Sequence, residues 1–537
     1  MKKILALTFC IFLGGTNLLA QDTLFVDTLD PNQGQFLNKV ITDDNNSHIY
    51  KLKRGAIYFI DGPILTTTAF SMFGEPGPEE TMPAIIRPWI RDDGTIPSST
   101  FDVSGNFTLK NVYVMSVSPD GLLSQGLAAA IKTDNVVVTI DNCIWEGNSE
   151  NGIKVIGALP EVYIQNSVFR NCQNEGGFYN GRALWLDQGG EKVVLRNNTY
   201  LNFYTYVIVD RGSKELIIDH NTVVNSYYTP FHMHQQFNAQ ITNNVFYNAM
   251  FNPQSDREWL GNWDDTDNVH AAIFSFDTLN ATVQQFWDDN VPGGPWSESD
   301  RKIDVRNNTF FWSQPFADLW NGTDTLHASR FFNERTQNFF NDDVNYPNMT
   351  ESNNINIEPN FANKPDTEAQ QLENVRALRE PAGPSRTYWG FGGPRGTLAW
   401  PLPEDLSYDN AELLTGGTAG RPVGDLNWFG LAVSVSSPDE TNVPSTFDLE
   451  QNYPNPFNPA TTITYNITTA AEVQLTIYNL LGQKIRTLVN GERKNAGSYT
   501  VQWDSKDEMG RQVASGVYLY ELQAGTAIKT KKMLLLQ

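Results

Sequence analysis

The 537-residue sequence has little cysteine and little histidine, with three Cys and six His. So few cysteines exclude a disulfide-rich scaffold, because small domains of that kind depend on many paired cysteines. Basic residues are also in the minority, with 38 Lys and Arg against 61 Asp and Glu and a formal net charge of −23. This balance excludes a generic binder of nucleic acid or of anionic membranes, since either needs a basic surface.

Long hydrophobic runs are absent as well, so we expect no membrane span. The run at residues 4–13 follows Lys2 and Lys3, and Ala20 is a suitable last residue before a cleavage point. These features are typical of a signal peptide over residues 1–20, with a buried N-terminal helix as the alternative. The sequence therefore predicts a protein that is secreted or displayed at the outer cell surface.

A six-residue unit rich in Asn recurs through the middle of the chain. The units begin at residues 111, 142, 166, 197, 220, 243 and 307. The first residue is Asn in six units and His220 in the other, and four units end on Asn. Most spacings lie between 23 and 31 residues, which predicts a parallel β-solenoid with three short strands in each coil. Stacked Asn side chains would hydrogen-bond along its axis at the turns.

This repeat resembles the right-handed parallel β-helix family, which includes pectate lyases, other polysaccharide lyases and polygalacturonases. The resemblance implies an all-β chain with its solenoid over residues 101–360, and a polysaccharide as partner. No catalytic motif of the family can be transferred. We expect an N-terminal cap and first coils over residues 21–100, and an irregular tail over residues 361–433 that packs on the solenoid.

The end of the chain carries the motifs FDLEQNYPNPFNP (447–459), YNLLGQ (478–483) and SGVYLY (515–520). Alternation at Val473, Leu475 and Ile477 marks one face of a strand, and glycines punctuate several short strands, as in a small immunoglobulin-like β-sandwich. Residues 447–537 resemble the C-terminal sorting domain of cargo of the type IX secretion system. The resemblance implies that this machinery is a partner, and leaves release or surface attachment open. Residues 434–446 read as a linker.

The repeat also bears on the two cysteines outside the N-terminal segment. Cys143 and Cys172 occupy positions of their units that differ by five residues. Five extended residues span about 16 Å, whereas a disulfide needs Cα atoms within about 7 Å. We therefore predict two unpaired, buried thiols.

A further strand lies between successive Asn units: GIKVIG (152–157), ALWLDQ (183–188), YVIVDRG (206–212), FHMHQQ (231–236) and IFSFDT (273–278). Period-2 alternation predicts which residues of each strand point outward. They fall into one column of Lys154, Trp185, Ile208, His232 and Ser275, and another of Ile156, Asp187, Asp210, His234 and Asp277.

This arrangement would bring Asp187 and Asp210 side by side, with Arg211 and His234 next to them. Two carboxyl groups about 5 Å apart suit the acid and its partner in glycoside hydrolysis, so these four residues are the candidate catalytic set. Lys154, Trp185 and His232 would bind substrate. The alternative is a solvated polar face whose Asp residues form turns before Gly189 and Gly212.

The spacing of 64 residues between the last two units marks a long insertion, about residues 249–302. Long loops on a solenoid often carry function. Its tryptophans could stack on sugar rings, and its acidic residues, with Asp277, could bind Ca²⁺. The candidate residues are Trp259, Trp263, Trp287 and Trp296 for substrate, and Asp264, Asp265, Asp267 and Asp277 for the metal. The alternative is that the tryptophans form the core of the loops.

These features predict a monomeric, secreted β-helix protein that acts on polysaccharide as a hydrolase or lyase. A lyase ranks lower, because an acidic chain matches a polyuronate poorly unless Ca²⁺ intervenes. The second hypothesis is a non-catalytic surface protein that binds glycan or acts as an adhesin.

Overall fold

The computed structural model describes residues 22–536 except 174–179, 204, 211, 234, 252–271, 292–293, 322–328, 366–367, 370, 374–392, 432–447, 450–451, 453–454, 468–470, 480–481, 495–496 and 526. The chain divides into two compact units, Met1–Val435 and Ser436–Gln537. The division falls within the stretch that the sequence suggests is a linker.

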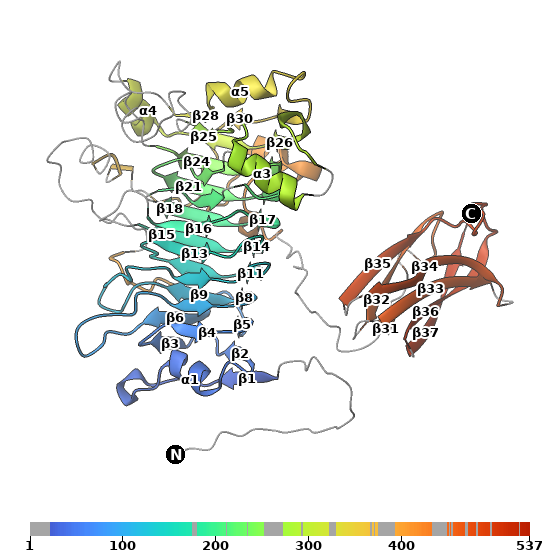
Figure 1. The fold of residues 1–537 in the computed structure, drawn as a ribbon, viewed down its shortest axis with the longest axis horizontal. Helices are drawn as coiled ribbons and strands as arrows, with labels where there is room; N and C mark the ends of the chain where they lie inside the picture. Colours follow the sequence, from blue (N-terminus) through green and yellow to red (C-terminus); the bar gives the residue numbers. More distant parts are fainter. Residues whose placement is uncertain are drawn as a thin grey trace. The chain divides into compact units, whose positions relative to one another are not determined.

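The first unit is a stack of coils in which strands of three parallel sheets alternate (Figure 1). Sheet A contains β1 (Thr23–Val26), β2 (Ile49–Leu52), β5 (Phe70–Gly74), β8 (Phe107–Lys110), β11 (Val137–Asp141), β14 (Glu161–Gln165), β17 (Lys192–Arg196), β20 (Glu215–Asp219), β23 (Asn238–Thr242), β26 (Lys302–Arg306) and β29 (Met349–Ser352).

Sheet B contains β3 (Ile57–Ile60), β6 (Ala84–Pro88), β9 (Val112–Met115), β12 (Ile144–Glu146), β15 (Val168–Cys172), β18 (Thr199–Phe203), β21 (Thr222–Ser226), β24 (Val245–Ala249), β27 (Thr309–Phe311) and β30 (Ile355–Asn356). Sheet C contains β4 (Ile64–Thr66), β7 (Phe101–Val103), β10 (Ala129–Ile131), β13 (Asn151–Val155), β16 (Arg182–Leu186), β19 (Ile208–Asp210) and β22 (Phe231–His232). Through most of the stack each sheet takes every third strand along the chain, as the repeat predicts.

Helices and short strands complete the first unit. The helices are α1 (Leu37–Asp43), α3 (Ala281–Asn290), α4 (Gln314–Asn321), α5 (Glu334–Phe340) and α7 (Ala411–Thr415), with 3₁₀ turns η1 (Pro31–Gln33), η2 (Glu298–Asp300), η3 (Thr418–Gly420) and η4 (Leu426–Phe429). A small sheet pairs β25 (Ala272–Phe274) with β28 (Arg330–Phe332). Helix α1 lies at the start of the stack and α5 at its end (Figure 1), and both bury apolar residues against the solenoid core. These helices therefore cover the two ends of that core.

The interior of the solenoid is apolar and stacked in layers. Trp145, Phe169 and Tyr200 follow one another on three coils, with ring centroids 6.0 and 5.5 Å apart. All three side chains are buried. Such columns remove large apolar surfaces from water and supply most of the stabilising free energy of the unit.

The Asn units form the turn between sheets A and B. The first residue of all seven units has a positive φ of 51° to 60°, including His220. Asn adopts this left-handed conformation at little cost because its short side chain can hydrogen-bond locally. The requirement for this turn explains why Asn recurs at this position.

A ladder of Asn side chains runs through the buried second position of the later units and continues to the half-buried Asn354. The Asn198 amide donates to Asn221 (3.0 Å), Asn221 to Asn244 (3.0 Å), Asn244 to Asn308 (2.9 Å) and Asn308 to Asn354 (2.9 Å). A second ladder links Asn171, Asn202, Asn225 and Asn248. These contacts confirm the predicted hydrogen bonding along the axis.

Residues 393–431, here called the strap, pack on the outer face of sheet B. Leu406 packs with Leu201, Val224 and Tyr247. The buried Glu404 pairs with Arg170 at 3.1 Å, and Arg170 also binds Glu146 of the neighbouring strand at 3.3 Å. The strap therefore covers an outer face of the solenoid with both apolar and ionic contacts.

The second unit is an antiparallel β-sandwich. Its strands are β31 (Asp448–Leu449), β32 (Thr461–Ile467), β33 (Ala471–Asn479), β34 (Lys484–Lys494), β35 (Gly497–Trp503), β36 (Gly516–Ala524) and β37 (Ala527–Leu535). They form sheets in the orders β31-β32-β35 and β34-β33-β36-β37 around one shared core. Val473, Leu475 and Ile477 all point into that core, which confirms their predicted common face.

Cys143 and Cys172 are buried free thiols, as predicted. Burial raises the pKa of each thiol to about 12, so both stay uncharged. Within the described residues, no helix has the length and apolar character needed to cross a membrane.

The Asn ladder can be tested by replacing Asn221 with Ala. The change leaves the backbone N–H of Asn198 and the carbonyl of Leu195 without their partner. We expect a loss of about 2–4 kcal/mol of stability, measured as a lower urea midpoint. The control is Gln240→Ala, at an exposed position of β23, the strand that pairs with β20 just before Asn221. This change should leave the midpoint unchanged. Equal midpoints for both variants would contradict this role of the ladder.

Candidate functional site

The outer face of sheet C carries a column of side chains that leads to the candidate site. Lys154 of β13 pairs with Trp185 of β16, Trp185 with Val209 of β19, and Val209 with His232 of β22. Lys154, Trp185 and His232 therefore share one column, as the alternation predicts. The residue between them, however, is Val209 and not Ile208.

The register of β19 corrects the predicted pairing of the two aspartates. Ile208 pairs with the inward residues Leu184 and Phe231, and Asp210 pairs with Leu186 rather than Asp187. The prediction was wrong because residues 207–209 are all β-branched and apolar, so alternation does not decide which of them points inward. The expected side-by-side carboxylates are not formed, and Asp210 continues an inward column.

Asp210 is consequently almost inaccessible, with 2% of its surface exposed. Its Oδ1 accepts hydrogen bonds from the Gly212 N–H at 3.2 Å and the Ser213 hydroxyl at 2.8 Å. Its Oδ2 is buried and has no hydrogen-bond partner among the described residues. Burial raises the pKa of Asp210 to about 6, against the lowering effect of the Ser213 hydroxyl and of the backbone N–H groups of Gly212 and Ser213.

Asp187 stands in a different environment from Asp210. It lies just beyond β16 and forms an ion pair with Lys154 at 3.3 Å. The same ammonium lies 4.9 Å from the centre of the Trp185 ring, and the guanidinium of Arg182 lies 4.1 Å from that ring. Trp185 thus has cationic groups against it, and the Asp187 carboxylate is paired with a cation.

His232 and Asp277 are two further described members of the predicted columns. The His232 ring stacks on Tyr206, with centroids 4.8 Å apart. Asp277 follows β25 and forms an ion pair with Arg335 of α5. Since Asp277 is paired with a base, its predicted role as a metal ligand has no support from its surroundings. No group of three or more potential ligands for a metal occurs within the described residues.

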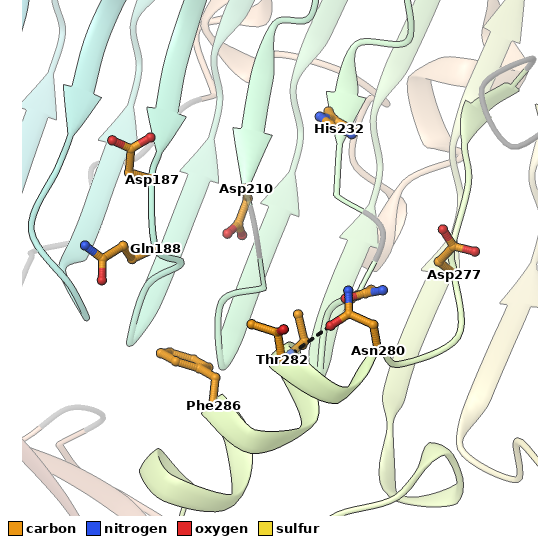
Figure 2. A pocket seen from close by; sticks show the side chains of 10 residues that line it. Asp187, Gln188, Asp210, His232, Asp277, Asn280, Thr282 and Phe286 are labelled. Carbon is orange, nitrogen blue, oxygen red and sulfur yellow. Dashed lines mark hydrogen bonds between the residues drawn. The ribbon is translucent and has the colours of Figure 1, made fainter. Parts of the chain in front are cut away.

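Asp187, Asp210, His232 and Asp277 line a cavity of 580 Å³ between the end of sheet C and helix α3. Lys154 and Trp185 are not among its lining residues. Figure 2 shows Asp187, Asp210, His232 and Asp277 on successive coils, with the N-terminal half of α3 beside them. The lining residues are Asp187, Gln188, Asp210, His232, Gln235, Asp277, Asn280, Thr282, Val283 and Phe286. The cavity therefore combines carboxyl, amide and hydroxyl groups with one apolar wall.

Helix α3 supplies the part of the cavity that sequence reasoning missed. Asn280 caps the helix by accepting a hydrogen bond from the Val283 N–H at 2.9 Å. Val283 and Phe286 then face the cavity, while Trp287 on the same side packs inward. The signal was present as an Asn cap followed by apolar residues at helical spacing. The Asp- and Trp-rich sequence around it favoured reading the whole segment as loops.

The two described tryptophans of the insertion belong to its own core. Trp287 is fully buried, which corrects the expectation that it stacks on a sugar. Trp296 is half-buried, and the rings of both tryptophans pack edge to face on Phe237, at 4.9 and 4.7 Å. They hold α3 in place beside the cavity.

Several predicted residues lie outside the described residues. They are Arg211 and His234 of the catalytic set, Trp259 and Trp263 of the substrate set, and Asp264, Asp265 and Asp267 of the metal set. Their roles stay predictions.

Comparison with known proteins agrees with the fold of both units. Residues 100–310 match the model of the right handed beta helix region, and residues 458–527 match the model of the FlgD Ig-like domain. The chain therefore consists of a right-handed parallel β-helix followed by an immunoglobulin-like β-sandwich.

No curated protein matches the chain. One similar solved structure is PorZ, described as an essential bacterial surface component of the type-IX secretion system of Porphyromonas gingivalis. It is 18% identical with a TM-score of 0.14, and the match covers 19% of this chain and 13% of PorZ. A likeness of this extent carries no argument about function.

The burial of Asp210 predicts an unusual dependence of stability on pH. Its pKa is about 6 in the folded chain against an ordinary 3.8, so the folded state binds the proton more tightly. The resulting stability is present below the unfolded pKa and is lost as pH rises through the folded pKa. Asp210→Asn carries no such titration. We expect this variant to exceed the wild type by about 3 kcal/mol at about pH 8 and to match it at about pH 4.

The measurement is the urea midpoint of both proteins at the two pH values. Asp102→Asn, which removes an ion pair with Lys132 elsewhere on sheet C, is the control and should show no such gain. A difference between Asp210→Asn and the wild type that does not change with pH would contradict the buried titration.

Proposed function

We propose that this chain is an exported protein that binds a saccharide in the cavity beside α3 and hydrolyses one of its glycosidic bonds. The observation that carries the proposal is the contrast between two carboxyl groups of one cavity. Asp210 is buried, with a pKa of about 6, whereas Asp187 is paired with Lys154. Carboxyl groups whose environments favour opposite protonation states are the usual acid and partner of glycoside hydrolysis.

Asp210 acts in this proposal as the general acid. Its neutral form donates a proton to the glycosidic oxygen while the bond from that oxygen to the sugar carbon breaks. The Asp187 carboxylate then either activates water or attacks the sugar carbon itself. Phe286 offers an apolar wall for the ring face, and Gln188 and Thr282 offer hydrogen bonds to hydroxyls.

Export and display belong to the same proposal. The N-terminal segment has the pattern of a signal peptide, and the C-terminal unit carries the motifs that resemble a type IX sorting domain. The sandwich fold of that unit supports this assignment, with the secretion machinery as partner. The chain would then be secreted or held at the outer cell surface.

A second candidate is a surface protein that binds glycan without cleaving it. Two observations favour it: Asp187 and Asp277 are each paired with a base, and Asp210 is only 2% exposed. Binding of Ca²⁺ by Asp264, Asp265 and Asp267 stays a prediction under either candidate function. Its test is calorimetry with Ca²⁺ and with a chelator.

Asp210→Asn and Asp187→Asn separate the two candidates. A hydrolase should lose turnover by about 10²- to 10⁴-fold in either variant while it still binds the saccharide. Turnover is measured as reducing ends released from a panel of neutral and acidic glycans, and binding by calorimetry. Asp102→Asn is the matched control, because it removes an ion-paired aspartate of sheet C that does not line the cavity.

The hydrolase is contradicted if the wild-type protein binds a glycan of the panel and releases no reducing ends from it. That result would favour the non-catalytic candidate. If no glycan binds at all, the proposed function itself is wrong.

A further inference from the structure

The turns that follow β16 and β19 of sheet C bring two successive coils into close contact at Asp210. Gly189 and Gly190 follow β16, and Gly212 and Ser213 occupy the corresponding turn after β19. A Cβ added at Gly190 would lie 3.0 Å from the Ser213 hydroxyl oxygen, and one added at Gly189 would lie 2.8 Å from the Gly212 carbonyl. Only glycine allows this approach, so the two turns stack backbone on backbone.

This contact orders the Ser213 hydroxyl. The N–H of Gly190 donates to the Ser213 Oγ at 2.8 Å, and the Ser213 hydroxyl donates to Oδ1 of Asp210 at 2.8 Å. A hydroxyl has one proton to donate, so accepting from Gly190 directs that proton to Asp210. Ser213 is fully buried, which excludes water as a competing partner.

The two oxygens of Asp210 are therefore unequal. Oδ1 accepts two hydrogen bonds, from Ser213 and from the Gly212 N–H, whereas Oδ2 has none among the described residues. An oxygen that already accepts two hydrogen bonds is a poor position for a proton, since that proton would lie close to the hydrogens of the two donor groups.

We propose that Ser213 is the positioning residue of Asp210: it occupies Oδ1, so that the proton of the neutral acid resides on Oδ2. The inference rests on the proposed function, which makes Asp210 the acid, and it assigns the proton of that acid to one of its two oxygens. Gly190 takes part through its N–H, which turns the hydroxyl toward the carboxyl group.

The same hydrogen bond opposes the effect of burial on the pKa of Asp210. The Ser213 hydroxyl favours the ionised carboxylate and lowers the pKa of Asp210 against the effect of burial. The other titratable groups of the cavity are Asp187, paired with Lys154, Asp277, paired with Arg335, and His232. Arg211 and His234 lie outside the described residues.

The test is the titration of Asp210 in the full chain, followed by NMR with ¹³C-labelled aspartate. In Ser213→Ala the pKa of Asp210 should rise by about one to two pH units. Ser213→Thr keeps the hydroxyl and should restore the wild-type value. Ser226→Ala is the matched control, because this equally buried hydroxyl also accepts an N–H, from Met250, but donates to a carbonyl, that of Tyr228.

An unchanged pKa of Asp210 in Ser213→Ala would overturn the proposal. If that variant does not fold, neutron diffraction of the wild-type protein below pH 6 answers the same question. A deuteron on Oδ2 supports the assignment, and a deuteron on Oδ1 overturns it.

Neither the NMR titration nor the neutron diffraction requires the protein to cleave a glycan. If the protein cleaves a glycan but the pKa of Asp210 is unchanged in Ser213→Ala, only this inference is wrong and the proposed function stands. A shifted titration in a protein that cleaves no glycan would refute only the proposed function.

Discussion

The parallel stacking of equivalent backbones is the constraint on which the rest of this structure depends. Each coil repeats the same three strands about 4.8 Å above the last, so every side chain has a counterpart on the next coil. The Asn ladder that contains Asn221 holds that register, because the Asn221 amide satisfies backbone groups of its own turn and of the preceding coil. A residue's place in the coil therefore determines both its burial and its neighbours.

Asp210 shows how this constraint produces chemistry. Its place opposite Leu186 is an inward one, where the other coils carry apolar residues. A carboxyl group in such a place loses the solvation of its charged form, which raises its pKa. Nearby Asp187 continues an outward column and finds Lys154 instead. Asp210 lies opposite Leu186 rather than Asp187. This difference of one position in the register places the Asp210 carboxyl group in the core and leaves that of Asp187 in an ion pair.

Much of this could be predicted from the sequence. The Asn turns, the three strands per coil, the sandwich and the free thiols follow from periodicity, and so do the positions of Lys154, Trp185 and His232. The register of β19 could not be predicted, because Val207, Ile208 and Val209 leave alternation without a preferred face. The cavity wall on α3 was missed for a related reason: Val283 and Phe286 gain their role only when Trp287 packs against Phe237. Local patterns do not report such tertiary contacts.

The most direct test of the proposed hydrolysis is a crystal structure of the Asp210→Asn variant with a bound oligosaccharide chosen from the glycan panel. We expect a sugar ring against Phe286, with a glycosidic oxygen within hydrogen-bond distance of the side chain at position 210. A saccharide bound on another face of the solenoid, or one in the cavity whose glycosidic oxygens all lie away from that side chain, would contradict the proposed hydrolysis.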